Sequence, residues 1–470
     1  MSSGANSQQL SGVAVDTVHL GAAAELPPSF EQVNEDILSR LRNPGPGWYI
    51  LLGISGCLLL TGGYIWSQLL DQGLGLWGLN RPNGWGFDIT TFVFWVGITH
   101  SGTLMSAIFY LFGAPWRASI SRIAEAMTVF AIATAAIFPI LHLGRAWLFY
   151  WMIPFPNEGH FPFNYRSPLM WDVFAINTYL TVSLMFWYLG MVPDLAAVRD
   201  RSTGVRKAIY AVFSLGWRGS GRQWWHFKSL YLLLASLTIP LAISVHSVVS
   251  WDFAMGIVPG WHSTVFAPYF VSGAIFSGLA LLCDLLITLR WAFRLDRYIT
   301  TEHYDKLGRL LVLMSLLMSF CYASEFFSVW YAGDPIESES FHYRAFGNYA
   351  PLFWLMIACN CIFPLLLSRE SLRRNNKVLF VVAALINVGM YLERLIIVGV
   401  SLTRDFDPYT WRIYIPTIYE WGILAGSIGV FSFLFLLFLR FCPAVPMYEV
   451  KEVFHHEAAQ LESGARKAGH

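Results

Sequence analysis

The sequence predicts an all-α polytopic membrane protein with ten transmembrane helices. Charged residues make up 13% of the chain and apolar residues 56%, whereas a soluble protein of this size is about a quarter charged. Ten apolar stretches each supply the roughly 20 residues that a helix needs to cross the hydrocarbon core. We expect the spans at 48–70, 87–113, 122–150, 170–196, 227–250, 262–289, 308–332, 350–368, 377–401 and 414–440.

Lysine and arginine are distributed unevenly between the two sides of these spans. Seven cations lie between spans four and five, five lie around the loop between spans six and seven, and four lie around the loop between spans eight and nine. Cytoplasmic loops carry the excess of such residues. The pattern therefore predicts a multi-pass membrane protein with both termini in the cytoplasm. The opposite loops hold only Arg81, Arg166, Arg344, Arg404 and Arg412.

Two parts of the chain resemble each other at a constant offset. Pro168-Leu-Met-Trp171 and Pro351-Leu-Phe-Trp354 match, and the same offset pairs His142 with Glu325. We expect two parallel-repeat four-helix bundles, spans 2–5 and 6–9, flanked by spans 1 and 10. The expected divisions are a cytoplasmic extension 1–47, the first span and an outer loop 48–86, the first bundle 87–250, the second bundle 251–401, the last span 402–442 and a cytoplasmic tail 443–470.

Ionisable residues inside the spans gather near one face. An intramembrane charge is costly, so each such group indicates a functional site by default. Outer segments 71–86, 151–169 and 334–349 are rich in aromatic residues and are expected to form ordered lids or docking surfaces. The ionisable residues in the outer halves of the spans are His142, Arg145, Asp172, His246, Asp252, Glu325, Glu393 and Arg394.

His142 and Asp172 form the candidate reactive pair. Residues three apart share a helix face, which places Arg145 beside His142, and Asp172 begins the next span. A neutral histidine and a carboxylate suit oxidation of a hydroquinone, because quinol releases two protons with its two electrons. The offset matches Asp172 to Leu355, which predicts a single reactive site. The alternative is a hydrogen-bonded pair that only ties spans three and four together.

The remaining polar groups admit two interpretations. Asp88 and Asp252 either cap their helices, the favoured interpretation, or extend a proton path with His246. Glu325 and Arg394 are expected to pair, either as a structural ion pair or as part of a proton relay. A path from Asp284 through His100 to the outer cluster is a further hypothesis.

No cofactor site is expected within the chain. The six cysteines lie in or beside apolar segments without a CxxC pair, which is typical of buried small hydrophobic residues. Membrane haems need histidine pairs at matching depth, and only His142 and His246 are expected to match. We therefore expect no metal, and the near-zero net charge gives no indication of nucleic-acid binding.

Several motifs resemble the NrfD/PsrC family of quinone-interacting membrane subunits. They are Trp85-Gly-Phe-Asp88-Ile-Thr, Phe94-Trp-Val-Gly-Ile-Thr-His100-Ser-Gly, His142-Leu-Gly-Arg145-Ala-Trp and Ser167-Pro-Leu-Met-Trp-Asp172. The chain looks most similar to the ActC subunits of alternative complex III, over nearly its whole length except the two tails.

This resemblance implies a subunit of a respiratory or photosynthetic quinol:electron-acceptor oxidoreductase in the bacterial inner (cytoplasmic) membrane, with no redox cofactor of its own. Quinol would be oxidised near the outer face, and proton translocation could accompany the reaction. His142 and Asp172 would bind quinol (menaquinol or ubiquinol), with Arg145, Asp252 and His246 nearby. Electrons would pass to an exterior iron–sulfur subunit, with a paralogous membrane subunit and multihaem cytochromes c as further partners, so that iron–sulfur clusters and haems belong to partners only. The alternatives are a quinone-reducing anchor of a polysulfide- or dimethyl-sulfoxide-reductase-type complex and, less favoured, a secondary transporter.

Overall fold

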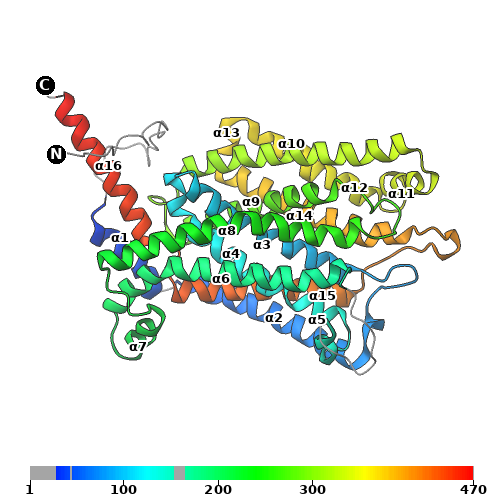
Figure 1. The fold of residues 1–470 in the computed structure, drawn as a ribbon, viewed down its shortest axis with the longest axis horizontal. Helices are drawn as coiled ribbons and strands as arrows, with labels where there is room; N and C mark the ends of the chain where they lie inside the picture. Colours follow the sequence, from blue (N-terminus) through cyan, green and yellow to red (C-terminus); the bar gives the residue numbers. More distant parts are fainter. Residues whose placement is uncertain (1–27, 43–44, 153–164, 469–470) are drawn as a thin grey trace, which may run out of the picture.

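The computed structural model describes residues 28–42, 45–152 and 165–468, and the part it describes is built from helices and their connections (Figure 1). Ten segments are long and apolar enough to cross a membrane, which confirms the predicted all-α fold with ten spans. They are α2 (Pro46–Gln72), α3 (Phe87–Leu111), α4 with α5 (Ser121–His142), α6 (Pro168–Asp200), α8 (Gly221–Ala254), α9 (Phe266–Phe293), α10 (Thr301–Ala332), the α12 segment (Ala350–Ser368), the α14 segment (Asn376–Thr403) and α15 (Ile418–Phe441).

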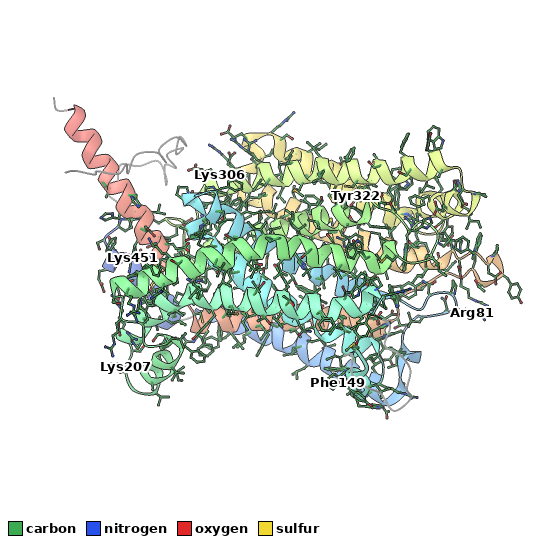
Figure 2. All side chains as sticks on the ribbon, viewed as in Figure 1. Arg81, Phe149, Lys207, Lys306, Tyr322 and Lys451 are labelled. Atoms are coloured by element: carbon green, nitrogen blue, oxygen red, sulfur yellow. The ribbon has the colours of Figure 1, made fainter. Side chains whose placement is uncertain are left out.

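The spans lie side by side along the longest axis of the molecule, and lysine side chains lie at one end. Figure 2 shows Lys207, Lys306 and Lys451 at one end, and Arg81 and Phe149 at the other. Following the positive-inside rule, we refer to the first end as cytoplasmic and the second as outer. Both α1 (Phe30–Arg42) and α16 (Met447–Ala468) lie at the cytoplasmic end (Figure 1).

Small residues allow the central helices to approach closely. Helix α3 contacts α4, α8, α9 and α14, and it is the span with the largest buried share. A methyl group added at Gly278 of α9 would lie 1.4 Å from Ser101 Oγ of α3. Helices α2 and α15 meet in the same way, because a Cβ at Gly62 would lie 2.7 Å from the Cα of Gly426. Such small-residue contacts are the usual basis of helix packing in lipid.

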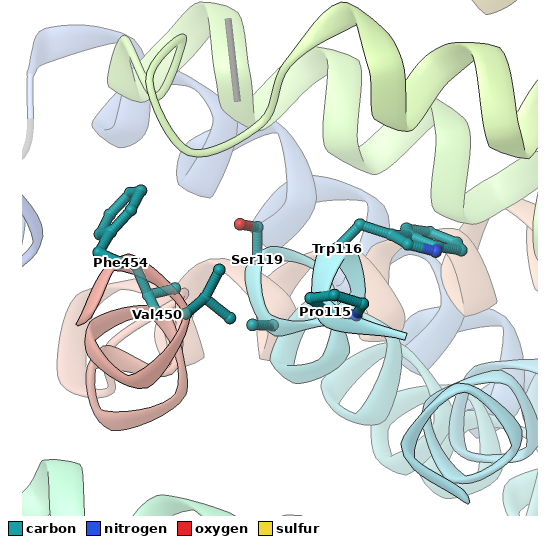
Figure 3. Close-up of a pocket in the computed structure, with 7 residues that line it drawn as sticks. Pro115, Trp116, Ser119, Val450 and Phe454 are labelled. Atoms are coloured by element: carbon teal, nitrogen blue, oxygen red, sulfur yellow. The ribbon is translucent and has the colours of Figure 1, made fainter. Parts of the chain in front are cut away.

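At the cytoplasmic end, α16 packs against the turn η2 (Pro115–Ser119). Figure 3 shows Val450 and Phe454 facing Pro115, Trp116 and Ser119 around a cavity of about 10 Å³, which is room for a single water at most. Buried ion pairs hold the same layer together. They are Arg117 with Glu449 at 2.9 Å and Arg122 with Asp194 at 3.0 Å.

At the outer end, Glu420 ties the last span to two connecting segments. Its carboxylate accepts hydrogen bonds from the backbone N–H of Gly78 (2.9 Å) and from the Tyr414 hydroxyl. The same hydroxyl accepts from the N–H of Phe87 (2.8 Å), the first residue of α3. Burial, together with the Glu420 carboxylate, raises the pKa of Tyr414 above its ordinary value. This phenol therefore stays a donor at neutral pH and fixes the outer end of α3.

The outer segments differ in how much of them the structure describes. Segment 334–349 forms a short helix, α11 (Pro335–Phe346), which begins at an Asp334 cap. Most of the predicted lid 151–169 falls in residues 153–164, outside the described residues.

The membrane orientation is directly testable with reporter fusions. Fusions after Arg206 and Arg374 should report the cytoplasm, and fusions within 155–165 and 337–345 should report the outside, because cations are retained on the cytoplasmic side. Alkaline phosphatase and fluorescent-protein activities provide complementary readouts. An inverted pattern would place the polar cluster described below on the cytoplasmic face.

Candidate functional site

The outer end of α3 holds a histidine–carboxylate pair. The Nδ1 of His142 lies 2.7 Å from Asp88 Oδ2, and Asp88 is buried whereas the His142 side chain is 25% exposed. The other oxygen, Asp88 Oδ1, accepts from the N–H of Ile89 (2.8 Å). A carboxylate on Nδ1 fixes the tautomer, which leaves Nε2 as the proton acceptor. Capping was the favoured interpretation of Asp88, but Gly86 stands at the N-cap position and Asp88 lies in the first turn.

A break in the third span positions His142. Helix α4 ends at Ala135 and α5 (Ile137–His142) ends at the histidine itself. Gly144 then takes a positive φ of 66°, a conformation that glycine adopts without strain. The chain turns away there, and Arg145 is exposed. The expectation that His142 and Arg145 share one helix face is therefore wrong, because the helix stops before Arg145.

Asp172 pairs with a carboxyl group of another helix. Asp172 lies near the start of α6 and Asp252 in the last turn of α8, and the two carboxyl groups are close enough to interact. Two neighbouring carboxyl groups can share a hydrogen bond only when one of them carries a proton, since an ionised carboxylate only accepts. The preceding residues also meet, with the rings of Trp171 and Trp251 6.0 Å apart. Asp252 therefore does more than end its helix.

The two pairs occupy the same end of adjacent helices. Trp85, three residues before Asp88, packs against Phe253, which follows Asp252, with ring centroids 5.9 Å apart. Each pair also retains a capacity to accept protons. His142 retains Nε2, and within the described residues Asp172 Oδ1 and Asp252 Oδ1 are buried without a hydrogen-bond partner. The structure thus pairs His142 with Asp88 and Asp172 with Asp252, instead of joining His142 directly to Asp172.

His246 lies deeper than predicted. Helix α8 continues for eight residues beyond it, to Ala254, and the ring packs against His100 of α3 with centroids 4.8 Å apart. His100 Nδ1 donates to the Val96 carbonyl (2.6 Å), which leaves Nε2 as the acceptor, and the Tyr179 ring stacks on His100 with centroids 4.5 Å apart. Neither nitrogen of His246 has a well-aligned partner among the described residues.

The predicted pairing of Glu325 with Arg394 is wrong. Glu325 binds Arg344 of α11 at 3.2 Å, and Arg344 also donates to Ser401 Oγ at 2.8 Å. Arg394 lies 2.8 Å from its neighbour Glu393 and 4.4 Å above the Phe270 ring.

The Phe270 ring contacts both polar groups of the membrane interior. Besides Arg394, it lies next to His246, with ring centroids 6.0 Å apart. Next to Arg394, Glu393 accepts from Tyr322, whose hydroxyl in turn accepts from Asn360. A cavity of about 10 Å³, lined in part by Tyr269, joins Glu393 to the Glu325–Arg344 pair.

Asp284 does not join the predicted path. Its carboxylate faces Asn387 of α14 at 3.4 Å, and no contact with His100 is found within the described residues.

Four functional candidates were missed from the sequence. Arg344 was assigned to an outer loop, and Tyr179 and Asn360 carried no charge to mark them. Glu125 did carry a signal, as a lone carboxylate inside a span; its Oε1 accepts from Ser106 (2.6 Å) and Tyr231 (3.0 Å).

The arrangement suits proton acceptance better than metal binding. Within the described residues, no group of three or more His, Cys, Asp or Glu side chains is placed to hold a metal ion. The outer end of the first bundle instead offers a histidine, fixed in one tautomer, and a carboxyl pair with spare acceptor atoms. The second bundle has Leu355, partly exposed, at the position equivalent to Asp172.

Ten spans with paired ionisable groups at one end define a multi-pass integral membrane protein with a polar cluster at one end of its helices. The chain belongs to the family described as polysulphide reductase, NrfD, whose model matches residues 76–404. This match confirms the family that the motifs indicate.

Three curated relatives resemble the chain over most of its length. A protein named as a membrane subunit of dimethyl sulfoxide reductase, from Halobacterium salinarum, is 27% identical, covering 87% of this chain and 93% of its own. A selenate reductase subunit from Mesobacillus selenatarsenatis is 23% identical, covering 80% of this chain and 89% of its own. An Hdr-like menaquinol oxidoreductase integral membrane subunit from Archaeoglobus fulgidus is 22% identical, covering 86% of this chain and 96% of its own.

The spectrum of the purified subunit tests the expected lack of a haem. His142 is engaged by Asp88, and the His100 ring is packed against Tyr179 and His246, so we expect neither a Soret band nor bound iron once partner subunits are removed. Absorption spectroscopy and metal analysis provide the measurement. A Soret band that stays with this subunit would identify it as a b-type cytochrome.

Proposed function

We propose that this chain is the quinol-oxidising membrane subunit of a respiratory oxidoreductase complex. The observation that carries the proposal is the outer cluster of the first bundle, where His142–Asp88 and Asp172–Asp252 lie at the same end of packed helices. Membership of the NrfD family and the naming of one relative as part of a menaquinol oxidoreductase support it.

The two pairs match the needs of a quinol head group. A quinol presents a hydroxyl at each end of its ring, and each hydroxyl needs an acceptor that can take its proton. His142 Nε2 supplies one acceptor, and the free oxygens of Asp172 and Asp252 supply the other. General bases of this kind contribute when they lie within hydrogen-bond reach of the proton they remove.

Oxidation of one quinol releases two electrons and two protons. We propose that one proton passes to His142 and the other to the carboxyl pair. Asp88 holds the imidazole in the accepting tautomer and stabilises its positive charge after transfer, as a buried carboxylate does for a histidine base. The two electrons leave for an iron–sulfur cluster of an exterior partner protein, the partner that the resemblance to the NrfD/PsrC family implies.

The similarities favour a terminal-reductase complex over alternative complex III. The dimethyl sulfoxide and selenate reductase subunits are relatives over most of both chains. A complex that reduces such acceptors consumes electrons, so its quinone-reactive subunit must oxidise quinol. The reductase-type alternative was expected to reduce quinone, but this electron balance requires it to oxidise quinol. The proposed quinol oxidation therefore fits a reductase complex as well as alternative complex III.

The inner polar groups fall into two roles. We assign His246 and His100 to a proton route that leads inward from Asp252, because both rings keep an unpaired nitrogen. The apolar Phe270 ring lies next to both His246 and Arg394, and Glu325 with Arg344 ties α10 to α11 as a structural ion pair. Asp284, held by Asn387, lies outside the route.

Site variants test the proposal directly. His142→Ala and Asp172→Asn should each lower quinol oxidation per assembled complex by about two to four orders of magnitude, the loss expected for a positioned proton acceptor. Turnover is measured with a soluble quinol analogue, and assembly by size-exclusion chromatography of the complex.

Leu355→Ala is the matched control, because it changes the equivalent position of the second bundle and should leave turnover nearly normal. If both site variants assembled poorly but turned over normally per complex, the pairs would be structural ties between helices and the assignment would fail.

A further inference from the structure

Helix α7 (Gly204–Phe213) stands apart from the ten spans. It joins the end of α6 at Asp200 to the start of α8 at Gly221. Figure 1 shows it on the flank of the bundle at the cytoplasmic end, level with the first turns of α8, whereas α16 extends beyond that end. Helix α7 therefore lies beside the cytoplasmic ends of the two spans that it connects.

One side of α7 is fastened to the protein. The buried Tyr210 donates its hydroxyl to the Phe441 carbonyl (2.6 Å), and Tyr188 of α6 donates to the Phe213 carbonyl (2.7 Å). The Arg206 guanidinium lies 5.6 Å from the Tyr210 ring centroid on the same side. The orientation of the helix about its own axis is therefore fixed.

A different side of α7 is apolar and uncovered. Val205 and Val212 are 77% and 71% exposed, and Ile209 and Phe213 are each about half exposed. At about 100° per residue, these four side chains fall within an arc of about 100° that is turned away from Tyr210. A helix with such a face, beside a bilayer, buries it in the boundary between headgroups and acyl chains.

The residues around α7 are strongly basic. Segment 201–228 contains six Lys or Arg residues and no Asp or Glu. Arg201 is paired with Glu31 and Lys228 with Glu452. The other four cations are Arg206, Lys207, Arg218 and Arg222. Lys207, labelled in Figure 2, and Arg218 are exposed.

The residues that follow α7 are rich in tryptophan. Trp217 and Trp224 pack edge to face with centroids 5.0 Å apart, and Trp225 is 66% exposed. Tryptophan is enriched where the bilayer meets water. The apolar face, the cations and the tryptophans thus all belong to one segment, residues 201–228, at the cytoplasmic end.

We propose that α7 lies in the plane of the cytoplasmic leaflet and that the cations around it form a binding site for anionic phospholipid headgroups. The apolar arc enters the acyl boundary, and Lys207 and Arg218 attract the phosphate charge. A zwitterionic lipid satisfies the apolar face but not the excess of cations. The site therefore selects anionic over zwitterionic lipid.

Lipid retention by the full chain in its purified complex tests the selectivity. Nanodiscs of phosphatidylcholine and phosphatidylglycerol in equal parts are used, and retained lipids are counted by native mass spectrometry. Lys207→Gln with Arg218→Gln should lower the preference for phosphatidylglycerol roughly five-fold per cation removed, since each contributes about that factor at a membrane surface.

Lys377→Gln is the control, because it removes an exposed cation from the same membrane face away from α7. An equal loss in the control, or no loss in the double variant, would overturn a local site and leave only the general charge of the cytoplasmic face.

A photo-crosslinking amino acid distinguishes lipid from a protein partner. Benzoylphenylalanine at Val212, on the apolar arc, should give lipid adducts, and at Ala211, on the opposite side of α7, far fewer. Adducts of Val212 with another protein of the complex would contradict the proposal, because the apolar face would then be an interface between subunits.

Discussion

The structure depends on how the ionisable side chains that enter the membrane are paired. An unpaired charge at the centre of a bilayer costs about 2.5–3.5 kcal/mol even on the lowest scales. Several buried groups meet that constraint with an ionisable neighbour of opposite type, as Asp88 does with His142, Glu325 with Arg344 and Arg122 with Asp194. The exceptions are informative. Asp172 and Asp252 face each other, so a proton on one of them removes the repulsion between two carboxylates. His246 packs on His100, and two neutral imidazoles can lie together without an opposite charge.

The two bundles differ in how they meet the constraint. In the second bundle, arginines lie against Glu325 and Glu393, and the outer helix α11 contributes one of them, Arg344. In the first, no arginine is bound to Asp88, Asp172 or Asp252 within the described residues, and the acceptors stay available at the outer end. Fixed ion pairs suit a scaffold, whereas groups that can gain and lose protons suit redox chemistry.

The sequence predicted the spans well and their polar contacts poorly. Hydropathy alone located all ten helices, because the requirement to cross hydrocarbon acts on each segment separately. Partners depend on rotation about each helix axis and on where a helix stops. Because α5 ends at His142, Arg145 does not lie in the cluster. Because α11 packs against α10, Arg344 pairs with Glu325, a contact that the sequence did not indicate. The motifs were sufficient to identify the family, but the terminal-reductase relationship came from full-length similarity.

The most direct test of the quinol site is a structure of the purified complex with a non-oxidisable quinol analogue bound, determined by electron cryo-microscopy. The account predicts that the head group lies at the outer end of the first bundle, with one oxygen next to His142 Nε2 and the other next to the Asp172–Asp252 pair. Density for the head group beside Glu325 and Arg344 in the second bundle, with the first left unoccupied at saturating analogue, would contradict it.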